Sequence, residues 1–345
     1  MKHASPPTLQ DIATAAGVST ATVSRVLNRP DDVRPALREK VEAQIRSAGY
    51  VRHGAARALA SAKSFTMGAV IPTLESAIFS TDVNAMQHRL DENGYTLLLA
   101  VTNYDPAHEL RQVRQLIERG IDGMILVGYD HLPETINLLE RHQCPYVMTW
   151  NYREQASGPC VGFDNIAAMI ELTNHLLDLG HRRFAMIAGI TAGNDRARDR
   201  ILGVRQALSA RGLELPERLI IEKPYEVWEG RLGLRALLSD RSEDRPTAVV
   251  CGNDVLAIGA MLEAQQMGLS VPKDLSVVGF DDLPISESLI PPLTTIRIPS
   301  RRMGKCAAEY LLDYLAGNTV AQQVELPTQL MVRRTTAAPS NWSEP

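Results

Sequence analysis

The segment 19–28 (STATVSRVLN) carries side chains that suit contact with DNA. Val23, Val26 and Leu27 recur at helical spacing and predict the buried face of a helix. The opposite face then carries small or polar side chains and one long donor: Thr20, Ala21, Thr22, Ser24, Arg25 and Asn28. Short side chains let a helix enter the major groove, where an arginine can read guanine or hold a phosphate. The alternative is an ordinary helical hairpin with a solvated polar face.

Two short helices joined by a turn must position that face. Thr8 can cap a first helix, with Asp11 three residues later to complete a capping box. Gly17 suits the left-handed backbone that ends a helix, and Ser19 can cap the second one. A third helix is expected over 35–48. Together these signals predict a helix-turn-helix head of three helices.

Charge is divided unevenly along the chain. Residues 1–62 hold nine Lys/Arg and five Asp/Glu, a net +4, whereas the remaining residues carry a net −8. A basic head on an acidic chain suits a protein that meets a polyanion at one end. Residues 51–64 are basic and rich in alanine, but Gly54 opposes a helix, so this piece is expected to fold only on binding.

Length and composition predict a protein of more than one domain. The chain has 345 residues, of which 45% are hydrophobic, so it can bury a large core and divide. The first seven residues contain no apolar run and no stretch approaches membrane-spanning length, which favours a cytoplasmic location over export. Cys144, Cys160, Cys251 and Cys306 lack metal-ligand spacing and are expected to be reduced thiols. We expect neither a metal nor a cofactor.

Beyond residue 64, apolar runs alternate with amphipathic stretches, which predicts parallel sheets with helices on both faces. The tripeptide Gly-Phe-Asp follows a strand-like run twice, at 162–164 and 279–281, so two comparable α/β halves are expected. The expected strands are 66–71, 95–101, 122–128, 145–149, 183–188, 218–222, 247–251, 275–280 and 294–298.

These features resemble the lactose-repressor and purine-repressor (LacI/GalR) family of bacterial transcription factors over essentially the whole chain. The resemblance implies a helix-turn-helix domain at 1–52, a hinge helix or linker at 53–63, and an effector-binding, dimerising core at 64–345. That core is of the two-lobed periplasmic-binding-protein type, with lobe 1 at about 64–162 and 294–325 and lobe 2 at about 163–293 and 326–345. The chain is expected to cross between the lobes near 162, 293 and 325.

The resemblance also implies which residues contact DNA. In the family the recognition helix contacts the operator, and a leucine matching Leu59 in the hinge enters the minor groove as an apolar wedge. The expected DNA-contact set is Thr8, Ser19, Thr20, Ala21, Thr22, Ser24, Arg25, Asn28, His53 and Leu59. Arg52 and His53 stand where the family usually has proline and asparagine or serine, and Gly54 is unusual within the hinge. These departures concern how strongly the hinge orders, not where it lies.

The second expected site is a cleft between the lobes, because ligands of open α/β sheets bind beyond the carboxyl ends of the strands. By resemblance, an arginine at Arg200 and an aspartate at Asp281 hold the effector, and an aromatic ring stacks on it. The expected effector set is Phe79, Trp150, Asp164, Asp195, Arg196, Arg200, Tyr225 and Asp281. An arginine–aspartate pair suits the hydroxyls of a sugar or the polar edge of a base.

These residues also have structural alternatives. Asp281 and Asp164 could be turn residues after strands, Arg200 could form a surface ion pair, and the aromatic residues could belong to the core. Asn253 and Asp254, at the start of an expected helix, are expected to be helix caps and not ligands.

Together these observations predict a ligand-responsive transcriptional repressor that binds a palindromic operator, with a small sugar or sugar-acid-like effector in the cleft. One alternative is a purine-type corepressed regulator, and another is a solute-binding protein of a transport system, disfavoured because no export signal is present. The motifs of serine hydrolases, phosphate-binding loops and zinc proteases are missing from the sequence, so no enzyme activity is expected. Residues 335–345 lack leucine heptads, which predicts a homodimer and not a tetramer.

Overall fold

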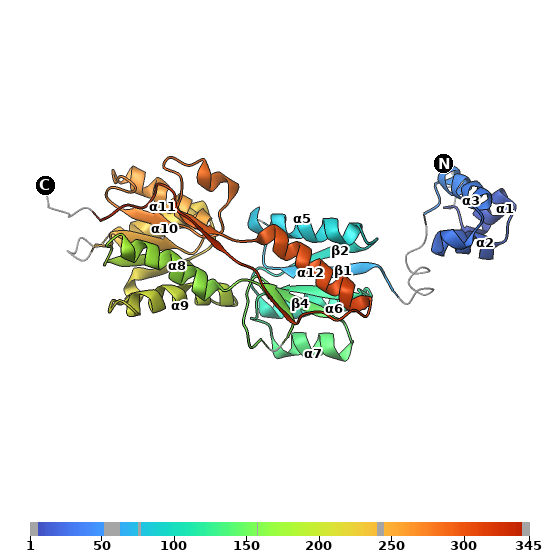
Figure 1. Ribbon diagram of the computed structural model, residues 1–345, viewed down its shortest axis with the longest axis horizontal. Helices are drawn as coiled ribbons and strands as arrows, with labels where there is room; N and C mark the ends of the chain where they lie inside the picture. The colour runs from blue at the N-terminus through green and yellow to red at the C-terminus, as the bar shows by residue number, and fades with distance from the viewer. Residues whose placement is uncertain (1–5, 52–62, 75–76, 157, 240–244, 340–345) are drawn as a thin grey trace. The chain divides into compact units, whose positions relative to one another are not determined.

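The computed structural model describes residues 6–51, 63–74, 77–156, 158–239 and 245–339 (Figure 1). They belong to two compact units, residues 1–64 and 65–345. The expected hinge residues His53 and Leu59 lie outside the described residues. Among the described residues, no helix combines the length and apolar content needed to cross a bilayer.

The first unit is a head of three helices. They are α1 (Leu9–Ala16), α2 (Thr20–Asn28) and α3 (Pro35–Ala48), with a short 3-10 helix, η1, at Pro30–Asp32. Ile12, Val23 and Val41 are fully buried where the three helices pack together. The helix-turn-helix expected from the sequence is therefore confirmed.

Local hydrogen bonds fix the ends of these helices. At the start of α1 the Thr8 amide donates to Asp11 Oδ2 over 2.8 Å, and the Asp11 amide donates to Thr8 Oγ1 over 3.3 Å. Gly17 ends α1 with a φ of 64°, which glycine adopts without strain. Ser19 Oγ then accepts from the Thr22 amide and caps α2. The caps expected from the sequence are confirmed.

The second unit begins with a six-stranded parallel sheet, which with its helices forms the first lobe. The strand order is β11-β5-β4-β3-β1-β2. The strands are β1 (Thr66–Ile71), β2 (Thr96–Val101), β3 (Gly123–Val127), β4 (Tyr146–Thr149), β5 (Cys160–Gly162) and β11 (Gln323–Glu325). Two helices, α5 (Ala77–Asp91) and α12 (Ser300–Leu315), cover one face of the sheet (Figure 1). The other face is covered by α6 (Pro106–Glu118) and α7 (Pro133–Arg141).

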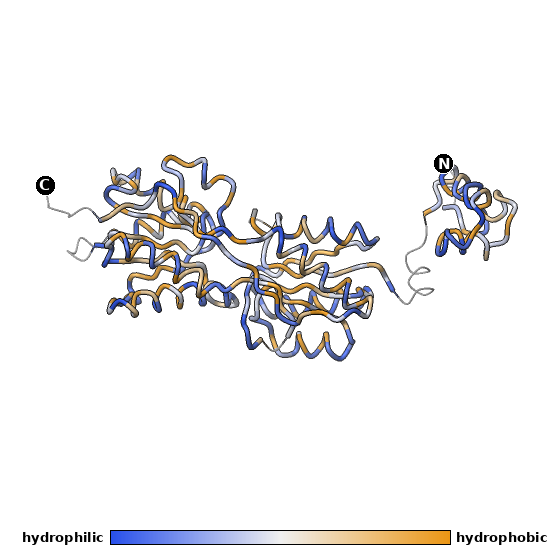
Figure 2. The backbone as a smooth tube through the Cα atoms, in the orientation of Figure 1, coloured by the Kyte–Doolittle hydropathy of each residue, from blue (hydrophilic) through white to orange (hydrophobic). Residues whose placement is uncertain are grey.

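A four-stranded parallel sheet with its helices forms the second lobe. Its order is β7-β6-β8-β9, with β6 (Phe184–Gly189), β7 (Ile220–Lys223), β8 (Ala248–Cys251) and β9 (Ser276–Val278). The helices pack in two pairs, α8 (Asn165–Asp178) with α9 (Asp195–Ser209), and α10 (Val227–Leu238) with α11 (Asp254–Gln266). Two short 3-10 helices, η2 (Glu217–Leu219) and η3 (Pro284–Glu287), lie in its connections. Figure 2 shows hydrophobic residues concentrated along the buried strands and alternating with hydrophilic ones along the helices, as sheets covered on both faces require.

The chain passes between the lobes in three places. It leaves the first sheet after β5, returns between β9 and α12, and leaves again after β11. The last two passages pair as antiparallel strands, β10 (Thr295–Arg297) with β12 (Gln329–Met331). Phe163 and Phe280, the central residues of the repeated Gly-Phe-Asp motif, are fully buried with ring centroids 6.1 Å apart. The two motifs therefore meet where the lobes join.

The two-lobed parallel architecture expected from the sequence is confirmed, with differences in the shortest strands. The expected strand 275–280 ends at Val278, and Asp281 and Asp282 just beyond the expected range adopt positive φ angles. The expected strand 294–298 pairs antiparallel, outside both parallel sheets. Two strands of three residues each, β11 and β12, were not expected, whereas β5 is the strand-like run before the first Gly-Phe-Asp motif. Such short strands show too few residues for a periodic pattern to stand out.

Candidate functional site

The exposed face of α2 presents one long side chain that is not engaged elsewhere. Arg25 is exposed, and its guanidinium has no hydrogen bond or ion pair to any described residue. Ser19 Oγ lies 2.9 Å from Thr22 Oγ1, and Asn28 Nδ2 donates to the Ser24 carbonyl over 2.8 Å. These short polar groups thus stabilise the helix, whereas Arg25 is available to an external acceptor.

The remaining residues of the expected DNA-contact set fall into three groups. Ala21 is exposed on α2, and Thr20 beside it is half-buried. Thr8 lies at the start of α1, where its hydroxyl donates to Asp11 Oδ2 over 2.7 Å as part of the capping box. His53 and Leu59 are outside the described residues.

A small cavity of about 30 Å³ lies where residues from both lobes meet. It is lined by Ile78, Phe79, Tyr104, Trp150, Asn194, Arg196, Arg200, Tyr225, Asn253 and Asp281. Six of the eight residues expected to bind an effector are among them: Phe79, Trp150, Arg196, Arg200, Tyr225 and Asp281. A second cavity of about 340 Å³ shares Tyr104, Asn194 and Tyr225 with it. We call these the inner and the outer cavity.

Arg200 and Asp281 form the polar centre of the inner cavity. Arg200 Nε donates to Asn165 Oδ1 over 2.9 Å, and its Nη1 donates to the Gly252 carbonyl over 2.7 Å. Its third nitrogen, Nη2, lies 3.8 Å from Asp281 Oδ1, too far for a hydrogen bond. The guanidinium is thus held in place with one nitrogen turned toward the aspartate.

Asp281 has an unused acceptor. Its side chain is 5% exposed, and Oδ1 finds no hydrogen-bond partner among the described residues. Burial raises the pKa of Asp281 to about 7, although the nearby Arg200 acts in the opposite direction. A buried oxygen without a partner is costly unless a ligand completes its hydrogen bonding. The pair therefore offers one donor and one acceptor to a molecule in the inner cavity.

Aromatic rings and strained backbone surround this pair. The rings of Phe79 and Trp150 have centroids 4.5 Å apart, and the Trp150 indole donates to Asp82 Oδ2 over 2.9 Å. Three lining residues have left-handed backbone, with φ angles of 61° at Tyr104, 71° at Trp150 and 112° at Asp281. Such angles cost of order 1–3 kcal/mol each in side-chain-bearing residues and cluster at functional sites.

Two expected effector residues have other partners instead of lining the cavity. Asp164 caps α8, where its Oδ1 accepts from the amides of Ile166 and Ala167 over 2.8 and 2.9 Å. Asp195 Oδ2 accepts from the Tyr129 amide over 3.0 Å and from the Asn151 amide group over 2.8 Å. Asp164 is therefore a helix cap, and Asp195 forms hydrogen bonds between the lobes.

Asp195 is part of a set of contacts that joins the lobes beside the cavity. Its Oδ1 also accepts from Arg196 over 2.7 Å, so the charge of Arg196 is neutralised within the protein. Asp199, one turn further along α9, accepts from Asn151 over 2.6 Å. Arg198 pairs with Asp130 of the first lobe. We call these contacts the interlobe latch.

The sequence did not single out Ile78, Tyr104 and Asn194 as lining residues. Tyr104 follows β2 by three residues, so its position beyond a strand end was the available signal. Asn253 caps α11 as expected, accepting from the Leu256 amide over 3.0 Å, and it also lines the inner cavity. Asp254 is not a cap: it accepts from Ser286 Oγ over 2.6 Å and from Thr295 Oγ1 over 2.5 Å.

A DNA-reading head followed by a two-lobed core with a ligand cavity is the arrangement of a ligand-responsive regulator of transcription. Comparison with protein families gives two matches: "Bacterial regulatory proteins, lacI family" over residues 8–53 and "Periplasmic binding protein-like domain" over residues 173–336. The chain belongs to the lacI family of bacterial regulatory proteins and is a DNA-binding transcriptional regulator with an effector-binding core.

Individual relatives agree with this assignment. The HTH-type transcriptional repressor CytR of Escherichia coli (strain K12) is 33% identical over 339 residues, which covers 98% of each chain. A crystal structure of the lac repressor dimer bound to operator and the anti-inducer ONPF has a TM-score of 0.85 and 30% identity, covering 96% of this chain and 100% of that chain. A transcriptional regulator CelR–cellobiose complex has a TM-score of 0.70 and 30% identity, covering 95% and 99%.

Proposed function

We propose that the chain is a transcriptional repressor that binds a palindromic operator as a homodimer and takes a small sugar or sugar-acid-like effector in the inner and outer cavities. One observation carries this proposal. The buried Arg200–Asp281 pair, 3.8 Å apart, retains an acceptor without a partner inside a cavity lined by aromatic rings. A sugar hydroxyl can accept from Arg200 and donate to Asp281 at once.

The charge and size of the cavities support this effector class. Because Arg196 is neutralised by Asp195, the inner cavity is close to neutral when Asp281 is ionised and positive when it is protonated. The first state suits a neutral sugar and the second a sugar acid. A cavity of about 30 Å³ holds only a few waters, so the polar edge of the ligand enters it and the remainder occupies the outer cavity. The relative CelR is described as a complex with cellobiose, a saccharide. A purine-type corepressed regulator is the second candidate, favoured by the stacking surfaces of Phe79 and Tyr225.

Homodimerisation is supported by exposed apolar side chains on the second lobe. Leu262 on α11, Ile285 in η3 and Ile290 beyond it are 45%, 52% and 98% exposed. These segments are held together by the hydrogen bond from Ser286 to Asp254. One recognition helix reads few base pairs, so two heads on a palindrome are needed for useful affinity. The lac repressor relative is described as a dimer bound to operator.

We further propose the division of labour expected from the sequence. Residues 1–52 read the operator, residues 53–63 form a hinge, and residues 64–345 bind the effector and dimerise. The chain acts in the cytoplasm without enzymatic activity. Its relatives CytR and the lac repressor are named as repressors, which supports a role without enzymatic activity.

A thermal-shift screen of sugars, sugar acids, nucleosides and purines tests the effector class. A ligand at a hundred times its dissociation constant stabilises the folded state by about 2.7 kcal/mol. We expect a sugar or sugar acid to raise the melting temperature of the wild-type chain and not of Asp281→Ala. A hit confined to purines would favour the second candidate, and equal shifts in both proteins would place the ligand elsewhere.

A further inference from the structure

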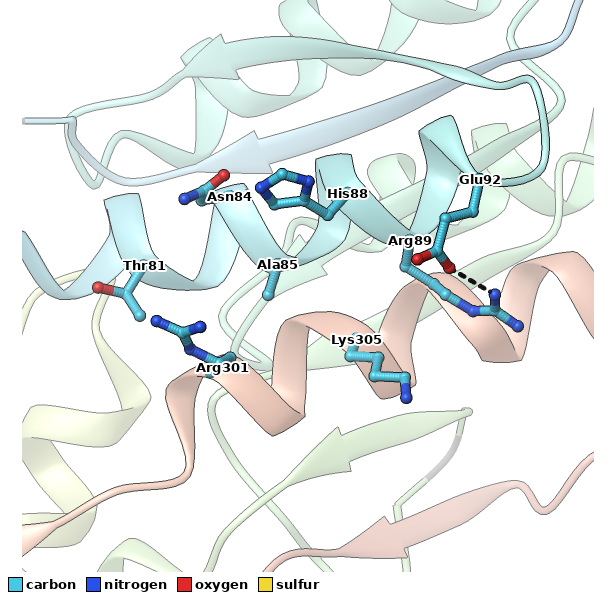
Figure 3. A pocket seen from close by; sticks show the side chains of 8 residues that line it. All are labelled: Thr81, Asn84, Ala85, His88, Arg89, Glu92, Arg301 and Lys305. Atoms are coloured by element: carbon cyan, nitrogen blue, oxygen red, sulfur yellow. Dashed lines mark hydrogen bonds and ion pairs between the residues drawn. The ribbon is translucent and has the colours of Figure 1, made fainter.

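A groove between α5 and α12 lies outside the effector cavities and has its own polar lining. It has a volume of about 330 Å³, within the range of small-molecule sites. The lining residues are Thr81, Asn84, Ala85, His88, Arg89 and Glu92 of α5, and Arg301 and Lys305 of α12 (Figure 3). The groove is thus formed by two helices of one lobe and does not include the interlobe cleft.

Donors in this groove outnumber acceptors. The only carboxylate among its lining residues, Glu92, accepts from Arg89 over 2.8 Å (Figure 3). Glu309 of α12, which is not a lining residue, lies 3.1 Å from Arg89 Nε, so Arg89 is paired with two carboxylates. Arg301 has no ion pair or hydrogen bond to any described residue, and Lys305 has only a distant contact of 3.8 Å with Glu309. Asn84 and His88 likewise have no described partner for their side chains. A net positive charge and several unused donors are therefore left in the groove.

The start of α12 adds to this positive character. The helix has 16 residues, its first turn holds no acidic residue, and Pro299 provides no side-chain cap. Arg301 and Arg302 instead occupy that first turn, where the helix dipole disfavours positive charge. A bound anion would satisfy the free amides and offset the repulsion. Figure 3 shows Arg301 at the start of α12, facing Thr81 of α5.

The two helices of the groove also reach the effector cavity on their other side. Phe79 of α5 lines the inner cavity, and Asp82 of α5 holds the indole of Trp150. Met303 of α12 contacts the Trp150 amide, with 3.2 Å between sulfur and nitrogen. An anion that bridges α5 and α12 would therefore fix the two helices that hold Trp150 in place.

We propose that this groove is a second ligand site, which binds the phosphate monoester of a small metabolite and is coupled to the effector cavity through Trp150. Arg301 and Lys305 pair with the phosphate, and Asn84 and His88 bond its ester substituent. A phosphate monoester fits better than a monocarboxylate, because its second charge can draw on Lys305, which lies 3.8 Å from Glu309, in addition to Arg301, which has no described partner.

Calorimetry on the full-length protein at 150 mM salt tests the site. The probes are ribose 5-phosphate and glycerol 3-phosphate, with ribose, glycerol, inorganic phosphate and sulfate as references. We expect both esters to bind with dissociation constants below about 1 mM, and Arg301→Gln and Lys305→Gln each to weaken them about tenfold or more, as loss of a charged hydrogen bond does. Arg302→Gln is the matched control: it removes an exposed arginine of the same turn that does not line the groove, and should change affinity less than twofold.

Several results would overturn the proposal. Failure of both esters to bind, or equal loss in Arg301→Gln and Arg302→Gln, would show that the groove has no specific site. Equal affinity for inorganic phosphate, sulfate and the esters would indicate an adventitious ion only. A lower molecular mass of Arg301→Gln in light scattering would show that the groove is a contact between subunits instead.

The coupling has its own readout. In a Trp228→Phe, Trp342→Phe background the remaining indole is Trp150, and ester binding should shift its emission. If the esters bind without shifting the emission of Trp150, the groove is a ligand site but is not coupled to the effector cavity. Because neither measurement needs operator DNA or the effector, failure here would not bear on the proposed repressor function.

Discussion

At the scale of single residues, the protein separates reading of DNA from binding of ligand. Arg25 on α2 is exposed and unpaired, so it is free to meet a base or a phosphate. Arg200 and Asp281 are the reverse case, because both are buried, and Arg200 Nη2 and Asp281 Oδ1 lie 3.8 Å apart without a hydrogen bond between them. The exposed position of Arg25 thus suits contact with DNA, and the buried position of Arg200 and Asp281 suits contact with a small ligand.

Replacement of Arg25 by alanine should weaken operator binding without loosening the head. If Arg25 reads a base, Arg25→Ala costs about 1 to 3 kcal/mol on the operator and much less on random DNA. Its exposed side chain contributes no packing, so the melting temperature should hardly change. Titration of both DNAs at one salt concentration measures this. Equal losses on the two DNAs would assign Arg25 to a phosphate.

Effector affinity should depend on pH through Asp281. Because burial raises the pKa of Asp281 to about 7, the folded protein keeps a proton there that the unfolded chain releases near pH 4. The free energy of unfolding therefore falls as pH rises from about 4 to about 7. A neutral sugar that donates to the ionised carboxylate should bind about tenfold more tightly at pH 8 than at pH 6.

Asp281→Asn is the matched variant for that measurement, since it keeps the shape and removes the titration. Its affinity should be flat between pH 6 and pH 8. Tighter binding at low pH in the wild type would indicate a sugar acid whose carboxylate faces Arg200. A flat profile in the wild type would contradict the role given to Asp281.

At the scale of elements, much of the arrangement could be predicted from the sequence. Caps and apolar spacing predicted α1, α2 and α3 because those signals are local. The strand-end rule predicted Trp150 and Asp281 as lining residues. The same rule could not tell that Asp164 caps α8 or that Asp195 bonds across the lobes, because partners distant in sequence decide those roles.

The interlobe latch offers a test at this scale. Gly128 follows β3 with a φ of 80°, and a Cβ there would lie 2.3 Å from Asp195 Oδ1 and still closer, 2.1 Å, to Arg196 Nη1. Gly120→Ala is a matched control, with a φ of 75° and open space around its Cβ. Both substitutions carry backbone strain of about 1–2 kcal/mol. Gly128→Ala should lose about 2 kcal/mol more in denaturant unfolding, since it also displaces Asp195. Equal losses would mean that the latch adds nothing to stability.

At the scale of the whole molecule, the proposed repressor needs two heads and hence two chains. Ile290 is 98% exposed on the second lobe, which is unusual for an isoleucine without a partner. Ile290→Asp should raise the dimer dissociation constant by tenfold or more in analytical ultracentrifugation. Val332→Asp replaces another exposed apolar residue, 57% exposed, and serves as its control. A wild-type monomer at micromolar concentration would defeat the dimer proposal.

In such a repressor, ligand and operator influence each other's binding through the core. An effector shifts the lobes only by its differential affinity for the two states, so a protein that cannot hold the effector must lose the response. Asp281 lies in the core and Arg25 in the head, which allows the two functions to be removed separately.

One measurement tests the coupling between ligand and operator most directly. It compares the operator affinity of the wild type with that of Asp281→Ala, each with and without the ligand found by the thermal-shift screen. Without ligand, both proteins should bind the operator with equal affinity. With ligand at about ten times its wild-type dissociation constant, the operator affinity of the wild type should change at least fivefold. Asp281→Ala should respond much less at that concentration, because a lost charged hydrogen bond costs about 1.5 to 3 kcal/mol of ligand affinity. A normal response by Asp281→Ala would contradict the account and leave Asp281 as a residue that only ends a strand.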